Sequence, residues 1–384
     1  METAAEAHES NPINDPTAAR GKRRVRWYRC PVAGEHLREL NQRSDLLGFG
    51  QTLGFLGLLA LNVALAIYSA SHWPWYVTVV LVYWNSMCWH FLINGFHELI
   101  HDSVFRTRWL NWFFLRIFSF LGWYNHHHFW ASHTEHHKYT LHPPDDGEVV
   151  LPQKVTLKDV IKYRFITIHH PYVSLRAHMR HAFGTLPQDP WTRALFPDSN
   201  EQGRRRFVAW ERILVIGHLS IAFGSLLMGW WMVPIVITFP MSMGGWLHML
   251  CNSSQHLGLS DNTPDYRLCC RTIYLNPFFQ FLYWHMNYHT EHHMYAAVPC
   301  YKLGRLHRLI KHDMPHCPNG LVETWTQIAG ILRRQKEDPS YQYVAEVPTR
   351  PPDRSHPPPG PTPESPSPAN LADVSPSSRP TRAI

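Results

Sequence analysis

Histidine is the residue type in this sequence that points most directly to chemistry, since 28 of the 384 residues are histidine. The densest clusters are His97-Glu-Leu-Ile-His101, His133-Thr-Glu-His136-His137 and His289-Thr-Glu-His292-His293. On a helix, side chains three or four positions apart lie on one face. Each cluster can therefore offer two or three imidazoles to a metal ion, and neutral imidazole is the commonest metal ligand near neutral pH.

The number of clustered imidazoles bears on the kind of metal site. A structural zinc ion takes four ligands, often thiolates, in a closed tetrahedron. The eight imidazoles of the three clusters instead suit two metal ions, each with room for O2. Nitrogen ligands suit iron, copper, zinc or nickel, so the ligand type alone does not name the metal. Iron is preferred once redox chemistry is assumed.

Other histidines fit this pattern less well. The adjacent residues His126 to His128 would point in different directions on a helix, so we expect them near the metal or the membrane interface rather than on the metal. His285 lies one helical turn before His289 and could extend the third cluster. Histidines among arginines are expected to form a solvated or headgroup-facing surface: His169, His170, His178 and His181.

Four apolar stretches must position the clusters. They run at about 46–70, 73–96, 213–231 and 233–250, and each approaches the roughly 20 residues that cross a bilayer. A short Ser-His-Trp-Pro link joins the first two, and Pro234 lies between the last two. The sequence predicts an all-α membrane protein with four transmembrane helices in two hairpins and a cytoplasmic helical cap that holds the metal site.

The distribution of charge predicts the orientation. Basic residues precede the first and third stretches, at Arg20 to Arg29 and Arg204 to Arg206, whereas the hairpin tips have no Lys or Arg. By the positive-inside rule, both termini and the metal site should be cytoplasmic. The net charge is +7, but the basic residues lie in separate clusters before apolar stretches and do not form one long patch. Nucleic-acid binding is therefore not expected. The apolar run at 109–124 is short and contains Arg116, which favours an interfacial helix.

Composition divides the chain into three parts. Residues 1–20 are polar and are predicted to be disordered, and residues 21–340 form the membrane domain. Residues 341–384 are rich in Pro and Ser and are predicted to be a disordered tail, because they cannot bury enough apolar surface to fold. The seven cysteines include no CxxC pair, which fits a reducing compartment.

The succession HxxxH, HxxHH and HxxHH on a four-span scaffold resembles the membrane fatty acid desaturase family, over about 46–309. The run Asn287-Tyr-His-Thr-Glu-His-His293 is similar to the third cluster of the acyl-lipid branch. In this family a motif NSxxH after the fourth span supplies a further histidine, and its asparagine reaches the metal through water. Asn252-Ser-Ser-Gln-His256 matches that motif, so the resemblance implies His256 as a ninth ligand and Asn252 as a water-mediated partner.

The resemblance implies an O2-dependent enzyme with two non-haem iron ions that introduces a double bond into a fatty acyl chain. The substrate would be an acyl lipid or acyl thioester, met among membrane lipids. The sequence contains no flavin, ferredoxin or cytochrome b5 motif, so electrons should come from an external donor of ferredoxin or cytochrome b5 type. We expect Asp102, Glu135 and Glu291 to orient ligating imidazoles by accepting their second N–H.

Several alternatives remain open at this point. A related di-iron hydroxylase or ketolase would share the clusters, as would a desaturase of a carotenoid or another non-fatty metabolite. A membrane zinc hydrolase or receptor needs about three protein ligands, fewer than the clusters supply. A metal transporter should carry ionisable residues along its spans, and the clusters lie at span ends. The sequence leaves the substrate, the bond position and the electron donor open.

Overall fold

The computed structural model describes residues 24–151, 165 and 170–348. Within these ranges the chain forms helices and loops, with isolated bridges and no strand. The N-terminal segment 1–20 and residues 349–384 of the predicted tail lie outside the described residues. Residues 341–348 of that predicted tail are described, and the Tyr343 N–H donates to the Gly258 carbonyl at 2.9 Å.

Long apolar helices dominate one end of the molecule. The stretches long and apolar enough to cross a membrane, among the described residues, are Asp45–His72, Trp75–Ile100 and Glu201–Leu227. The first is α2, which begins where the Ser44 side chain accepts the Leu47 N–H. The second comprises α3 (Trp75–Trp89) and α4 (Leu92–Ile100), and the third is α10 (Glu201–Leu227). Three of the predicted spans therefore correspond to helices of spanning length.

The predicted fourth span, 233–250, is not one continuous helix. It is divided into a π-helical turn, η3 (Pro234–Thr238), a 3-10 turn, η4 (Pro240–Ser242), and α11 (Trp246–Ser253). Proline lacks an N–H and clashes with the preceding turn of a helix, which accounts for breaks at Pro234 and Pro240. Gly244 then adopts a φ of +74°, a conformation that glycine accepts readily.

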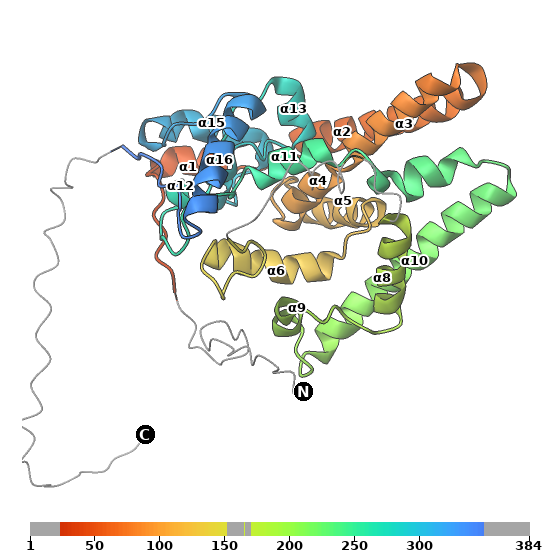
Figure 1. Ribbon diagram of the computed structural model, residues 1–384, viewed down its shortest axis with the longest axis horizontal. Coiled ribbons are helices and arrows are strands. Elements are labelled where there is room, and N and C mark those ends of the chain that lie inside the picture. The colour runs from red at the N-terminus through yellow and green to blue at the C-terminus, as the bar shows by residue number, and fades with distance from the viewer. Residues whose placement is uncertain (1–23, 152–164, 166–169, 349–384) are drawn as a thin grey trace, which may run out of the picture. The chain divides into compact units, whose positions relative to one another are not determined.

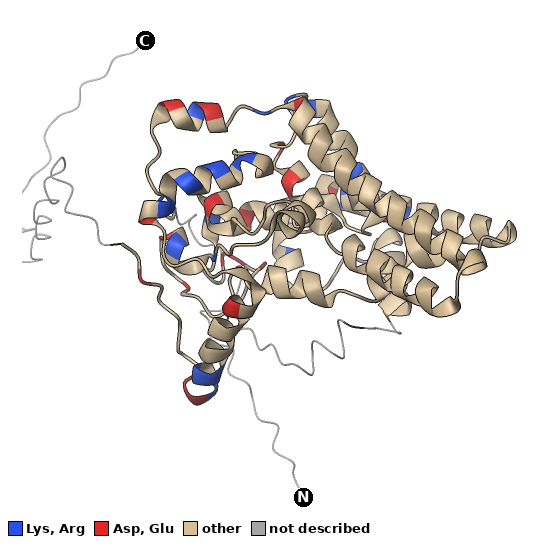
Figure 2. Ribbon diagram, turned by 90° about the horizontal axis from the view of Figure 1, so that it is seen from above, with Lys and Arg blue, Asp and Glu red and all other residues tan. Residues whose placement is uncertain are grey.

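Shorter helices form the other end, which we call the cap. Before α10 they are α1 (Gly34–Leu40), α5 (Arg108–Leu121), α6 (His126–Tyr139), α8 (His170–Ala182) and α9 (Pro190–Leu195). After α11 they are α12 (Tyr266–Cys269), α13 (Pro277–Leu282), α14 (His289–Met294), α15 (Cys300–Ile310), η5 (Lys311–Asp313) and α16 (Gly320–Glu337). Figure 1 shows the α2–α3 hairpin projecting away from α1, α12, α15 and α16. Charged residues gather on the cap and are nearly absent from the far ends of the long helices (Figure 2).

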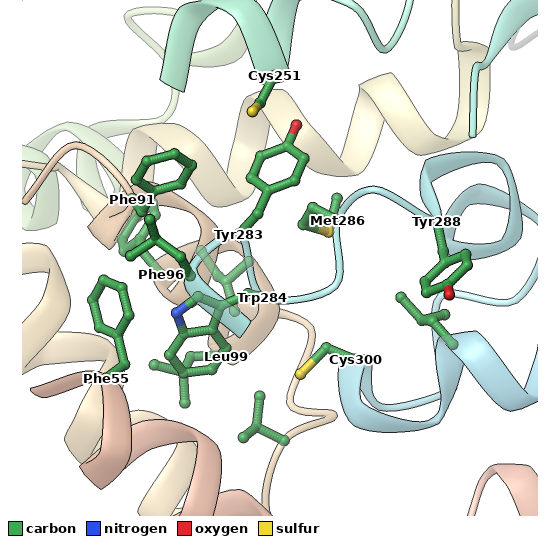
Figure 3. Close-up of a cluster of buried hydrophobic side chains, with 14 of the residues drawn as sticks. Phe55, Phe91, Phe96, Leu99, Cys251, Tyr283, Trp284, Met286, Tyr288 and Cys300 are labelled. Carbon is green, nitrogen blue, oxygen red and sulfur yellow. The ribbon is translucent and has the colours of Figure 1, made fainter. Parts of the chain in front are cut away.

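A buried aromatic core joins the first and third histidine clusters. Trp284 is fully buried, and its ring centroid lies 5.8 Å from that of Phe55 (Figure 3). It lies 5.4 Å from the ring centroid of Phe118. A Cβ added to Gly95 would lie 2.6 Å from Trp284 and 2.3 Å from Phe118. The absence of a side chain at Gly95 thus lets α4, which carries His97, pack directly on the segment that leads to α14.

Candidate metal centre

The structure brings all nine predicted histidine ligands into one buried region. His97 lies on α4 and His101 directly after it, while α6 carries the second cluster and α14 the third. His256 follows α11. His101 and His137 are half-buried, and the other seven side chains are buried: His97, His133, His136, His256, His289, His292 and His293.

The nine histidines separate into two groups. We call the first the five-histidine group: His97, His101, His133, His137 and His292. The second is the four-histidine group: His136, His256, His289 and His293. In each group one ring nitrogen from every member lies within 4.8 Å of those of the others. The second and third clusters are therefore each divided between two candidate metal sites, whereas their spacing alone suggested three nitrogens for one metal.

Distances between ring nitrogens within a group match those between ligands of one ion. The Nε2 atom of His137 lies 2.9 Å from that of His133 and 3.2 Å from that of His292. The Nε2 atom of His289 lies 2.8 Å from that of His256 and 3.0 Å from that of His293. With metal–nitrogen bonds of about 2.0–2.1 Å, neighbouring ligand nitrogens stand about 3 Å apart.

These contacts fit a shared metal ion better than a hydrogen-bond network. A ring nitrogen carries either one N–H or one lone pair, yet the Nε2 atoms of His137 and His289 each face two others. The Nε2 atom of His101 is buried and has no hydrogen-bond partner in the structure. A cation at the centre of each group would accept all of these lone pairs. The donor set therefore fits two metal ions.

The opposite ring nitrogens contact acceptors that fix the tautomer. The Nδ1 atom of His133 lies 2.9 Å from Glu148 Oε1, and that of His97 lies 3.1 Å from Glu98 Oε1. The His256 Nδ1 atom lies 2.8 Å from the carbonyl oxygen of Cys269. An Nδ1–H that donates to such an acceptor leaves the Nε2 lone pair directed at the metal position.

Burial favours the neutral imidazoles that metal binding requires. It lowers the pKa of His101 to about 4 and that of His256 to about 3. His136 differs because its Nδ1 atom lies 2.8 Å from Asp146 Oδ2. Burial opposes a charge on either group, but their mutual attraction keeps the pKa of His136 above, and that of Asp146 below, its ordinary value.

Sequence reasoning did not identify the carboxylates that contact the histidines: Glu98, Asp146 and Glu148. Glu98 is fully buried beside His97, and its Oε1 atom also lies 3.4 Å from His292 Nδ1. The other two belong to the acidic run that follows α6, where Asp146 Oδ1 accepts the Glu148 N–H at 2.9 Å. Their only signals in the sequence were adjacency to His97 and an acidic turn after the second cluster.

The carboxylates predicted for this role have other partners. Asp102 pairs with Arg108 at 3.1 Å, and Glu135 pairs with Lys138 at 2.6 Å. Glu291 is fully buried and contacts His307 and Thr272, each at 2.5 Å. Among the contacts of the described residues, none joins one of these three carboxylates to a predicted histidine ligand, so their orienting role has no support from these contacts.

Asn252 and members of both groups face one cavity of about 340 Å3. Its walls include His97 and His133 from the five-histidine group, and His136, His256 and His289 from the other. Apolar and polar side chains complete the lining: Ile93, Phe129, Val149 and Met286, together with Asn94, Glu148, Ser253 and Gln255. A second cavity, of about 530 Å3, reaches His101, His133, His137 and His293 from the cap, beside Arg29 and Lys138.

The remaining histidines lie outside both groups. His126 contacts Ser119 at 3.3 Å and His128 contacts Thr192 at 3.1 Å, so these two rings have other partners. His178 and His181 differ from the exposed surface expected of them, because their side chains are 16% and 19% exposed and lie near Glu211. His169 lies outside the described residues.

Comparison with known proteins names the family. A family model described as fatty acid desaturase matches residues 70–325, about two thirds of the chain. The chain belongs to the fatty acid desaturase family. The sn-1 oleoyl-lipid 12-desaturase of Arthrospira platensis is 25% identical over 261 residues, which cover 65% of this chain and 70% of that protein. This desaturase is accordingly an oxidoreductase of lipid metabolism, with helices that can span a membrane and histidine groups that can bind metal.

Proposed function

We propose that this desaturase uses O2 and two non-haem iron ions to introduce a double bond into a fatty acyl chain. The observation that carries the proposal is the division of nine buried or half-buried histidines into groups of five and four. Such nitrogen-rich sites suit iron. When bound, iron would supply the reduction of O2 and the cleavage of unactivated C–H bonds, which protein side chains cannot perform.

The protein would contribute position and shielding. Glu98, Asp146 and Glu148 hold ring nitrogens at 2.8–3.1 Å and so keep the opposite nitrogens directed inward. Asn252, which lines the cavity with His256 and His289, would hold a water molecule against the four-histidine group. Burial of the side chains excludes bulk water, which would otherwise compete with substrate and O2.

The cavity of about 340 Å3 is the proposed position of the reacting acyl carbons. Its histidines come from both groups, and Ile93, Phe129 and Met286 give it apolar surface. We propose an acyl lipid as the substrate class, because the similar protein of Arthrospira platensis is named as acting on an oleoyl lipid. An acyl thioester is the other candidate of the same chemistry. Electrons would come from a separate protein of ferredoxin or cytochrome b5 type.

We further propose four membrane crossings, with the cap and both termini in the cytoplasm. α10 leads away from the cap, yet His256 lies in the metal centre, so residues 228–255 must return over the same distance (Figure 1). Met232 and Val236 on this return pack against Ala66 of α2. The Asn85 amide of α3 donates to the Val236 carbonyl at 3.0 Å. The return would therefore cross the bilayer as a broken helix whose freed backbone groups bond to neighbouring helices.

Mass spectrometry of acyl lipids tests the reaction. The wild type, His292→Ala and His36→Ala would be expressed in one host, His36 being exposed on α1 and outside both groups. We expect acyl chains lighter by two hydrogens with the wild type and His36→Ala, and none with His292→Ala. Chains that gain one oxygen would identify a hydroxylase instead. Wild-type protein that retains no iron after purification would contradict the metal assignment.

A further inference from the structure

A buried carboxylate lies between α8 and α10, away from the two histidine groups. The Glu211 side chain is 2% exposed. Within the described ranges its ion-pair partners are His178 and His181, and not a lysine or arginine. A buried charge is normally paired or bound to a metal ion.

The three side chains converge on one point. His178 and His181 stand three residues apart on α8, so both rings lie on one face of that helix. The Nδ1 atoms of His178 and His181 lie 2.7 Å and 3.9 Å from Glu211 Oε2. One potential ligand atom from each residue lies within 4.8 Å of the others. The His181 Nδ1 atom is buried and has no hydrogen-bond partner in the structure.

We propose that His178, His181 and Glu211 form a third metal site, for a divalent cation of the zinc type. Two imidazoles and one carboxylate are a ligand set that zinc accepts, with the fourth tetrahedral position left for water. Ligand atoms around such an ion stand about 3.0–3.5 Å apart. Binding would therefore draw His181 inward by a few tenths of an ångström and separate His178 from Glu211 by a similar amount.

The site would secure the start of α6. Asn125 precedes α6, and its side-chain oxygen accepts the N–H groups of His127 and His128 at 3.1 and 3.2 Å. Its amide nitrogen donates to Glu211 Oε1 at 2.8 Å. A cation on Oε2 would fix the carboxylate and, through Asn125, the end of the helix that carries the second histidine cluster. This role does not depend on the reaction proposed above.

Metal analysis of the purified full-length protein tests the proposal. Iron-loaded protein would be titrated with Zn2+ against a coloured chelator, and zinc and iron per chain would be measured. We expect the wild type to bind one zinc ion tightly. Glu211→Gln and the double variant His178→Ala/His181→Ala should lose that ion and keep their iron. His316→Ala removes an exposed His–Glu pair and should bind zinc as the wild type does.

Two results would overturn the proposal. One is a wild-type protein that binds no zinc beyond the amount that replaces iron in the histidine groups. The other is a Glu211→Gln variant with undiminished zinc. If the variants lose iron as well, zinc absorption spectroscopy of the wild type decides the location. A shell of two imidazoles plus oxygen supports the site, whereas four imidazoles would place zinc in the histidine groups and refute it.

Discussion

The Nδ1 atom of His136 lies 2.8 Å from the Oδ2 atom of Asp146, which stands ten residues later in the turn after α6. The same carboxylate accepts the backbone N–H groups of Leu141 and Glu148, each at 2.9 Å. The turn therefore holds Asp146 rigidly, and Asp146 in turn holds one ring of the four-histidine group. Similar contacts through Glu98 and Glu148 serve the five-histidine group.

Asp146→Asn should weaken metal binding by the four-histidine group. The amide has no negative charge with which to favour the Nδ1–H tautomer of His136, and loss of such partners typically costs 10–100-fold in metal affinity or activity, as an order of magnitude. Iron titration of the purified protein measures the change. Asp145→Asn alters the neighbouring residue and should behave as the wild type. Equal iron affinity in both variants would refute this role.

Glu98→Gln should act on the other group. Glu98 Oε1 lies near the Nδ1 atoms of His97 and His292, at 3.1 and 3.4 Å, and both rings belong to the five-histidine group. We expect iron to fall from two ions per chain toward one, since the four-histidine group keeps its own partners. Iron analysis on Glu98→Gln and on Glu98→Gln/Asp146→Asn would separate the groups. A single variant that loses both ions would contradict their independence.

Glu291→Gln should loosen the helix that carries the third cluster. Glu291 accepts hydrogen bonds from Thr272 and His307, each at 2.5 Å, and His307 contacts the Tyr274 hydroxyl at 2.9 Å. Weakening buried bonds to a charged group costs about 1–3 kcal/mol in the free energy of unfolding. The temperature of thermal unfolding and the iron content per chain would both decrease. Glu135→Gln, which changes a surface pair with Lys138, should alter neither.

Unchanged iron and turnover in Glu291→Gln would end any argument that this residue supports the metal centre. A loss of stability with normal iron affinity would assign it to the fold alone.

Gly95→Ala should destabilise the contact between α4 and the segment before α14. The new Cβ would lie 2.3 Å from Phe118 and 2.6 Å from Trp284, and overpacking of this kind costs about 1–3 kcal/mol. Gly57→Ala is the matched control, because a Cβ there meets no atom within 4 Å and alanine favours a helix by about 0.5–1 kcal/mol. Circular dichroism during heating in detergent measures both. A Gly95→Ala protein that unfolds at the same temperature as the wild type would show that the rings of Phe118 and Trp284 move to accommodate the methyl group.

Much of the helical scaffold could be predicted because its signals are local. The first span begins after Ser44 and ends before Trp73, and the second begins after Pro74. Capping and proline chemistry at these positions can be recognised from neighbouring residues in the sequence. The broken return at 233–250 was predicted as one helix because its composition is apolar. Pro234 and Pro240 argue against a continuous helix, because proline interrupts helical hydrogen bonding, and a hydropathy profile does not take this into account.

The candidate site was predictable as a set of residues but not as an arrangement. Clustering identified the imidazoles, and resemblance added His256. The assignment of His136 to a different group from His133 and His137 depends on how α6 faces α14, which is a tertiary relationship. The contacts of Glu98 and Asp146 depend on the same packing. Proximity in the sequence favoured Glu135 instead, and that side chain pairs with Lys138.

The division of the clusters also sets an order for biogenesis. A nascent chain that has reached residue 137 already contains four of the five members of one group, but only His136 of the other. The remaining members of both groups, from His256 to His293, emerge after α10, the last helix of spanning length among the described residues, has been synthesised. The two groups therefore differ in how much of each the ribosome has made by that point. The four-histidine group acquires three of its four members only between residues 256 and 293, whereas the five-histidine group then lacks only His292.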